Sequence, residues 1–197
     1  MRIVKLLFMS AMIATSSVAA QPREARTAIA RDARIERQVE KILSKMTLEE
    51  KVGQMAEVGI DMFGNSVSGV AGDKPFVLNE EALQQIMEKY KVGSVLNAPG
   101  KALTAEQWNA IIERINEVSI RYTGLPTLYG IDAIHGATYT HRSPLFPQEI
   151  NAAASFNRSM VRDMAEKTAY EVRASNIPWT YSPTMDLGRK AAWSRVW

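Results

Sequence analysis

The sequence contains no cysteine in its 197 residues. A disulfide framework and a thiolate metal site are therefore excluded, and the fold must be stabilised by packing. Histidine is also scarce, since His135 and His141 are the only two, and neither stands at a metal-ligand spacing from the carboxylates. The sequence also has no glycine-rich phosphate loop and no nucleophile elbow. We therefore predict neither a metal centre nor a phosphate-binding loop.

Long hydrophobic runs are equally rare, and the one at residues 6–14 stands near the N-terminus. Arg2 and Lys5 precede it and the small residues Val18, Ala19 and Ala20 follow, which is the pattern of a secretory signal peptide. The run is too short to span a bilayer. We predict a signal peptide at residues 1–20, a linker at 21–33, and an exported protein, periplasmic or extracellular. No integral membrane segment is expected after the signal is removed.

An excess of charge of one sign is also missing. The formal net charge is +3, and Arg2 and Lys5 leave with the predicted signal peptide. The remaining charge gives no electrostatic reason to expect nucleic acid as a partner. The sequence makes no prediction about the oligomeric state.

From residue 34 onward, segments typical of helices alternate with segments typical of buried strands. The predicted strands are residues 54–60, 92–97, 125–131 and 179–185. An amphipathic helix is predicted from Ile35 to Met46, and later helix starts are marked by Thr47 with Glu50, Asn79, Thr104 with Gln107, and Asn157. Such alternation predicts a parallel α/β sheet with right-handed crossovers. Because a closed barrel of this kind uses about eight strands, we predict the first half of a TIM-type (β/α)8 barrel over residues 34–197, as in a truncated gene product or a fragment.

Two polar residues, Asp132 and His135, follow the strand predicted at 125–131. In α/β barrels the loops after the strand C-termini build the active face, so an acidic group there can meet a ligand. The alternative for Asp132 is a cap of the following loop, and the alternative for His135 is a loop-anchoring hydrogen bond to the backbone. Among the aromatic residues, Trp108 and Trp179 are predicted to pack in the core, whereas Tyr139 and Trp193 are better placed near a pocket.

Four sequence pieces carry a resemblance to a known family. They are Met-Thr-Leu-Glu-Glu-Lys-Val-Gly-Gln-Met at 46–55, Gly-Ile-Asp-Ala-Ile-His-Gly at 130–136, Leu-Phe-Pro-Gln-Glu-Ile at 145–150, and Ser-Pro-Thr-Met-Asp-Leu-Gly-Arg at 182–189. Together, and in this order, they resemble the N-terminal barrel of family-3 glycoside hydrolases, the group that contains β-glucosidases. The resemblance covers most of the chain from about Arg34 to Trp197.

The resemblance implies a retaining β-glucosidase that removes terminal non-reducing β-D-glucosyl residues from an oligosaccharide or β-glucoside and needs no cofactor. It also implies that the nucleophile and the acid/base lie downstream of Trp197, so no catalytic residue is assigned here. The residues that match the family's sugar-binding positions are Asp132 and, in the segment 189–195, Arg195, with His135 as a further candidate. Arg195 has a surface arginine as its alternative, because Lys190, Ala191, Ala192 and Ser194 depart from the family pattern. For the whole chain, a β-xylosidase or N-acetylhexosaminidase of the same family, or a non-catalytic sugar-binding remnant, remain open.

Overall fold

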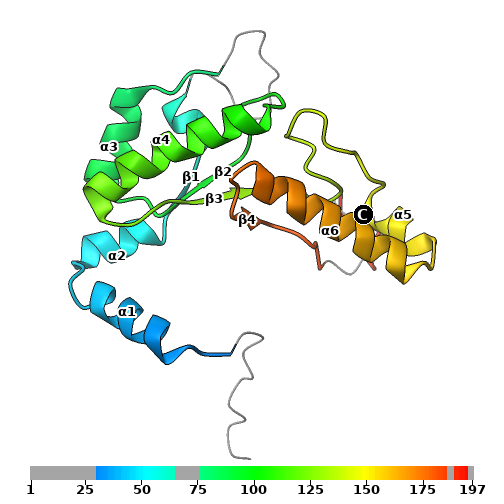
Figure 1. The fold of residues 1–197 in the computed structure, drawn as a ribbon, viewed down its shortest axis with the longest axis horizontal. Helices are drawn as coiled ribbons and strands as arrows, with labels where there is room; N and C mark the ends of the chain where they lie inside the picture. Colours follow the sequence, from blue (N-terminus) through cyan, green and yellow to red (C-terminus); the bar gives the residue numbers. More distant parts are fainter. Residues whose placement is uncertain (1–29, 65–75, 186–188, 195–197) are drawn as a thin grey trace, which may run out of the picture. The chain divides into compact units, whose positions relative to one another are not determined.

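The computed structural model describes residues 30–64, 76–185 and 189–194 (Figure 1). The chain divides into two compact units, residues 1–42 and 43–197. The predicted signal peptide and most of the predicted linker lie outside the described residues. In the first unit, helix α1 (Ala33–Leu43) has no buried residue, and Ile35, Val39 and Ile42 follow one another at helical spacing. None of the helices in the described part of the chain is both long enough and apolar enough to cross a bilayer.

The second unit is built on a four-stranded sheet. Its strands are β1 (Glu57–Gly59), β2 (Ser94–Leu96), β3 (Leu128–Ile131) and β4 (Trp179–Thr180), and they lie side by side in the order of the sequence. All three pairings are parallel. The predicted parallel α/β sheet is therefore confirmed, with four strands, half the number of a closed TIM-type barrel.

The helices of this unit lie before the first strand and between consecutive strands. They are α2 (Leu48–Gln54), the 3-10 helix η1 (Ile60–Phe63), α3 (Glu80–Tyr90), α4 (Ala105–Thr123), α5 (Glu149–Ala154) and α6 (Arg158–Ala174). Both predicted capping boxes are confirmed at the starts of α2 and α4. The Asn79 and Asn157 side chains accept the expected backbone hydrogen bonds at the starts of α3 and α6. The local start signals in the sequence therefore place four of these helices correctly.

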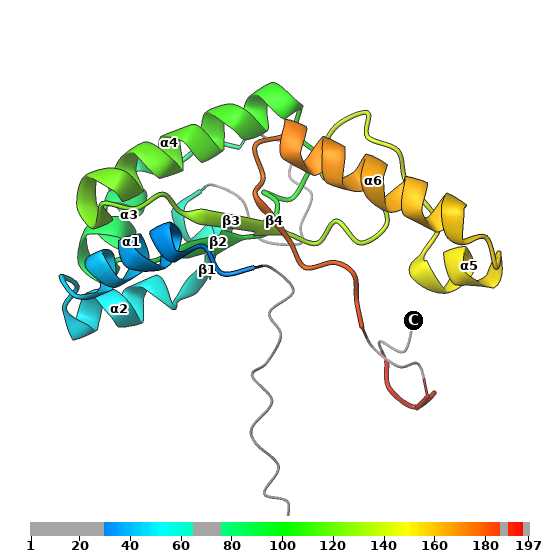
Figure 2. The same ribbon diagram turned by 60° about the horizontal axis from the view of Figure 1, so that its bottom comes forward.

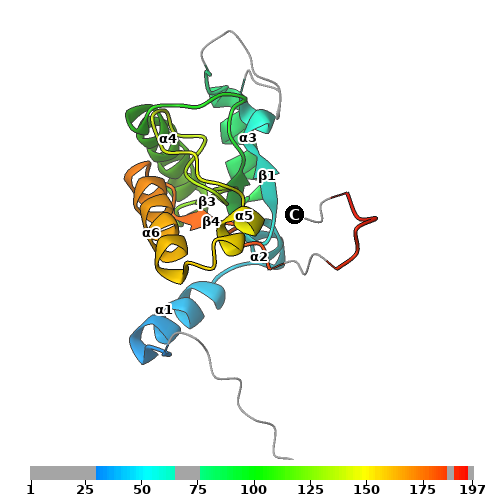
Figure 3. The same ribbon diagram turned by 90° about the vertical axis from the view of Figure 1, so that its right-hand side faces the viewer.

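One face of the sheet is covered by helices, and Figures 2 and 3 show α4 and α6 on that side. Val95 and Tyr129 stand at paired positions on β2 and β3 and are fully buried. The Trp108 ring of α4 meets the Tyr129 ring edge-on, with centroids 5.6 Å apart, and is itself fully buried. The prediction that Trp108 packs in the core is confirmed.

Successive side chains of a strand point to opposite faces, so the neighbours of Tyr129 in β3, Leu128 and Gly130, belong to the other face of the sheet. Leu128 on this face is 45% exposed, and Gly130 follows it two residues later. The Tyr181 side chain crosses this face: its hydroxyl donates to Glu57 Oε1 at 2.6 Å, so it joins the segment after β4 to β1. A β-carbon at Gly130 would overlap the Tyr181 ring and hydroxyl, so glycine is required for this crossing.

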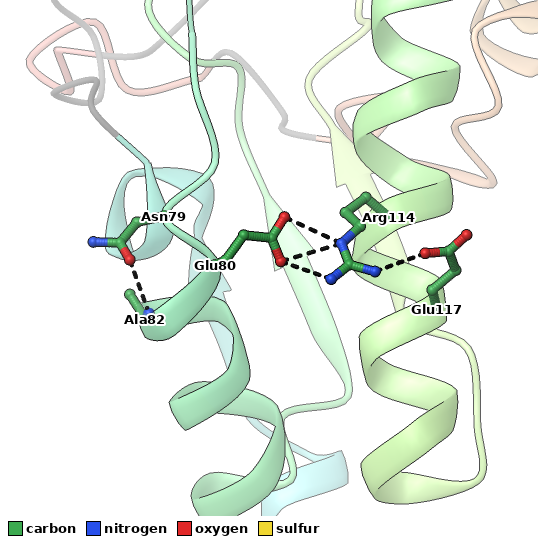
Figure 4. A network of polar contacts seen from close by, with 5 residues as sticks. All are labelled: Asn79, Glu80, Ala82, Arg114 and Glu117. Atoms are coloured by element: carbon green, nitrogen blue, oxygen red, sulfur yellow. Dashed lines mark hydrogen bonds and ion pairs between the residues drawn. The ribbon is translucent and has the colours of Figure 1, made fainter.

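An exposed ion-pair network joins α3 to α4 (Figure 4). The Arg114 guanidinium of α4 contacts Glu80 of α3 and Glu117 of its own helix, each at 2.8 Å. Two nitrogens of Arg114 donate to the Glu80 carboxylate, which gives the pair a fixed orientation. Because these side chains remain partly exposed, the network orients the two helices more than it stabilises them.

Some element boundaries differ from the sequence predictions. Gln54 ends helix α2 rather than opening a strand, and Ile60 begins the 3-10 helix, so β1 is only Glu57–Gly59. The strand predicted at 179–185 ends at Thr180, since the next segment contains Pro183, which has no N–H to donate to a ladder. The sequence does not predict helix α5, because its N-cap residue, Gln148, is not one of the residue types that mark a helix start. In the structure Gln148 makes no side-chain capping bond.

Candidate functional site

Asp132 lies one residue beyond β3, at the C-terminal edge of the sheet. Its neighbours Ile131 and Ala133 are buried, with 2% and 1% of their surface exposed, whereas Asp132 itself is exposed. Within the described part of the chain no hydrogen bond or ion pair engages its carboxylate. The structure therefore places Asp132 where the sequence predicted, with a fixed backbone and an available carboxylate.

The segment after β4 holds the backbone on both sides of Asp132. The Ala133 N–H donates to Thr180 Oγ1 at 3.3 Å and also approaches the Ile131 carbonyl at 3.1 Å. The Ser182 hydroxyl donates to the Ala133 carbonyl at 2.9 Å. The Tyr181 N–H donates to the Ile131 carbonyl at 3.1 Å. Sequence reasoning did not identify Thr180 or Ser182 as site residues, although Ser182 opens one of the four family-like pieces.

Two tyrosines share the electrostatic environment of Asp132. The pKa of Tyr139 is raised by burial first and then by the Asp132 carboxylate. The pKa of Tyr181 is raised by burial first, then by its hydrogen bond to Glu57 and the charge of Glu57, with a further contribution from Asp132. Both hydroxyls therefore stay protonated at neutral pH. That of Tyr181 donates to Glu57, and that of Tyr139 can donate a hydrogen bond near the Asp132 carboxylate.

The loop after Asp132 is anchored at two points. The Trp108 indole N–H and the Leu103 N–H both donate to the Tyr139 carbonyl at 3.0 Å. Further along, the buried Thr140 hydroxyl pairs with the Ser175 hydroxyl at 2.9 Å. Tyr139, whose side chain is 36% exposed, is thus carried by a backbone that the core fixes.

His135 is engaged with the same loop. Its Nδ1 lies 3.0 Å from the Phe146 carbonyl, and since a carbonyl only accepts, Nδ1 is the protonated nitrogen. The Phe146 N–H returns a hydrogen bond to the His135 carbonyl at 2.8 Å. Next to it, Gly136 has φ +113°, and a β-carbon there would overlap the Pro144 carbonyl. This geometry favours the loop-anchoring role of His135, and its contact with substrate stays a prediction.

A cavity of about 410 Å³ lies between this loop, the end of β4, and helices α5 and α6. Its walls are mainly apolar, from residues such as Ala133, Val161 and Met164. The polar members are His135, Glu149, Thr168, Thr180 and Ser182. Glu149 accepts hydrogen bonds from the Thr184 N–H, at 3.3 Å, and from the Thr184 hydroxyl. Asp132 is not among the described residues that line this cavity. The carboxylate and the cavity are therefore two separate features of the same loop.

The remaining predicted site residue, Arg195, lies outside the described residues. Trp193, two residues before it, is 44% exposed, and its N–H donates to the Lys190 carbonyl at 2.9 Å. Among the residues that the structure describes, no group of three or more histidine, aspartate and glutamate side chains could hold a metal ion. What the described site offers is an exposed carboxylate acceptor beside a tyrosine hydroxyl, which suits a neutral, hydroxyl-rich ligand.

Residues 47–197 match the family described as "Glycosyl hydrolase family 3 N terminal domain". The chain is 31% identical over 169 residues to a lysosomal beta glucosidase from Dictyostelium discoideum, covering 81% of this chain and 20% of that protein. It is 26% identical to a periplasmic beta-glucosidase from Salmonella typhimurium, covering 79% of this chain and 17% of that protein. It is 28% identical to a putative beta-xylosidase from Formosa agariphila, covering 82% of this chain and 21% of that protein.

Two solved structures are similar in fold and sequence. An exo-1,3/1,4-beta-glucanase from a Pseudoalteromonas species is 27% identical with a TM-score of 0.68, over 86% of this chain and 20% of that chain. A beta-glucosidase from Listeria innocua in complex with glucose is 28% identical with a TM-score of 0.58, over 82% of this chain and 20% of that chain. The chain spans about a fifth of the length of the proteins it matches.

Proposed function

Because this chain belongs to glycosyl hydrolase family 3, we propose that it supplies the sugar-binding edge of an exported β-glucosidase-type enzyme, which removes terminal non-reducing β-D-glucosyl residues with retention of configuration. The observation that carries the proposal is the position of Asp132, exposed at the C-terminal end of β3 between two buried residues. In α/β barrels this edge of the sheet is the one that binds substrate. Asp132 has a binding role in this proposal, not that of nucleophile or acid/base.

The chemistry of a terminal sugar fits this edge of the sheet. A pyranose presents several hydroxyl donors, and an ionised carboxylate accepts from two of them through charge-assisted hydrogen bonds. The Tyr139 hydroxyl, whose pKa is raised, supplies a donor for a sugar oxygen nearby, and the Tyr181 hydroxyl, which donates to Glu57, can accept a hydrogen bond from a sugar hydroxyl. His135 and Arg195 remain further candidates for substrate contact.

A β-xylosidase is the second candidate activity, because one relative of similar identity is described as a putative beta-xylosidase. Glucose and xylose differ by one hydroxymethyl group, and a pocket built for that group separates the two substrates by roughly tenfold or more. We expect the intact gene product to hydrolyse an aryl β-glucoside with the higher kcat/KM of the two. The measurement is steady-state hydrolysis of matched aryl β-glucoside and β-xyloside. A reversed preference would assign the xylosidase activity, and binding of glucose without turnover of either substrate would support a non-catalytic sugar-binding protein.

Export is part of the same proposal. It is supported by the charged, then apolar, then small-residue pattern of residues 1–20 and by the periplasmic location in the name of the Salmonella relative. We expect protein recovered from its source to begin at Gln21 or within a few residues of it. N-terminal sequencing checks this, and a soluble cytoplasmic product that retains Met1 would refute it.

A further inference from the structure

We propose that Thr180 and Ser182 are positioning residues that fix the Asp132 carboxylate for sugar binding, an inference that rests on the proposed function of Asp132. Both side chains act on one residue, Ala133, which directly follows Asp132. They are contributed by the strand end next to the one that carries Asp132.

The hydrogen bonds on Ala133 come from opposite directions. Thr180 Oγ1 accepts from its N–H at 3.3 Å, and Ser182 Oγ donates to its carbonyl at 2.9 Å. Ala133 is 1% exposed, so water cannot readily replace either hydroxyl. The Ser182 hydroxyl therefore satisfies the carbonyl of this buried residue, and its N–H is shared between Thr180 Oγ1 and the Ile131 carbonyl, which lies 3.1 Å away.

The residue on the other side of Asp132 is held by the same segment. The Tyr181 N–H donates to the Ile131 carbonyl at 3.1 Å. Three consecutive residues of one chain segment thus fix the backbone before and after Asp132. Because no described side chain binds the Asp132 carboxylate, the position of that carboxylate is set through its backbone and therefore through this segment.

A purely structural role for these hydroxyls makes a different prediction. Removing one would then lower stability and leave sugar recognition unchanged. If the hydroxyls position Asp132, a small displacement of the carboxylate weakens its hydrogen bonds to the sugar, since such bonds lose strength steeply with poor geometry. The two roles are therefore separated by measuring recognition and stability in the same variants.

The experiment measures glucose binding by calorimetry, together with kcat and KM for an aryl β-glucoside and the thermal midpoint, all in the intact gene product. We expect Ser182→Ala and Thr180→Val each to weaken glucose binding and raise KM about five- to tenfold, with a smaller change in kcat. Ser182→Thr keeps the hydroxyl and should restore most of the affinity. Thr180→Val preserves side-chain shape, so it carries the test if Ser182→Ala does not fold.

The matched control is Ser119→Ala. The Ser119 hydroxyl also donates to a backbone carbonyl, that of Leu125 at 2.8 Å, but this bond lies before the N-terminal end of β3; Ser119 is buried, whereas Ser182 is half-buried. We expect Ser119→Ala to lower the thermal midpoint about as much as Ser182→Ala does, while glucose affinity stays within about twofold of wild type.

A double-mutant cycle with Asp132→Asn separates the possible failures. If Thr180 acts through Asp132, adding Thr180→Val to Asp132→Asn should cause little further loss of kcat/KM. Full additivity, or normal glucose binding by both Thr180→Val and Ser182→Ala while Asp132→Asn loses it, would overturn the positioning role and leave the proposed function intact. Normal binding by Asp132→Asn itself would overturn both.

Discussion

Asp132→Asn is expected to lower kcat/KM for an aryl β-glucoside about a hundredfold or more in the intact gene product, with little change in the thermal midpoint. Asparagine keeps the shape of the side chain but removes the charge and converts one acceptor into a donor. Two charge-assisted hydrogen bonds to sugar hydroxyls, each worth about 1.5–3 kcal/mol, account for an effect of this size. Stability should hardly respond, because the carboxylate is exposed and no described residue bonds to it.

The measurement is steady-state hydrolysis by wild type and variant, with melting curves recorded alongside. Asp163→Asn is a suitable control, since Asp163 is an exposed aspartate on α6. It should leave both kcat/KM and the thermal midpoint close to wild type. Near-normal kcat/KM for Asp132→Asn, or a loss explained by a large drop in melting temperature, would remove the sugar-binding role proposed for Asp132.

Trp108→Ala is expected to destabilise the protein by about 3–5 kcal/mol, the range for removing a large buried aromatic side chain. The indole is fully buried, packs edge-on against Tyr129, and donates to the Tyr139 carbonyl. The substitution therefore leaves a cavity beside the sheet and removes one anchor of the Asp132 loop. Urea unfolding monitored by circular dichroism gives the change in free energy.

Two further variants separate the contributions of Trp108. Trp108→Phe keeps an aromatic ring but loses the indole N–H, so its cost should fall well below that of Trp108→Ala. Trp193→Ala removes a tryptophan that is 44% exposed and should change stability little. A Trp108→Ala variant within about 1 kcal/mol of wild type would contradict the assignment of Trp108 to the core.

The elements that the sequence predicted best are those with local chemical signals. Thr47 with Glu50 and Thr104 with Gln107 marked helix starts because a capping box is complete within four residues. Strand ends were less accurate, because the end of a strand depends on where its neighbour stops pairing. The sequence around residue 54 does not contain that information, so Gln54 was assigned to a strand although it ends α2.

In the candidate site, too, features with a local sequence signal could be predicted and those that depend on distant residues could not. Asp132 could be predicted because a polar residue directly after a short apolar run is visible in the sequence. The hydrogen bond from Ala133 to Thr180 could not, since the two residues are 47 positions apart and meet only through strand pairing. The hydrogen bond between Tyr181 and Glu57 spans 124 positions and depends on the whole sheet.

The order of the strands also has a consequence for how the protein folds. Each strand pairs with the one that precedes it in the sequence, so the sheet can grow from β1 to β4 by one crossover at a time. Each step then closes a moderate loop, and none requires the distant ends of the chain to meet first. The hydrogen bond between Tyr181 and Glu57 is the exception, because it joins the last segment to the first strand. It can form only after β2, β3 and β4 are in place, so it belongs to a late step in the assembly of these four strands and not to its nucleation.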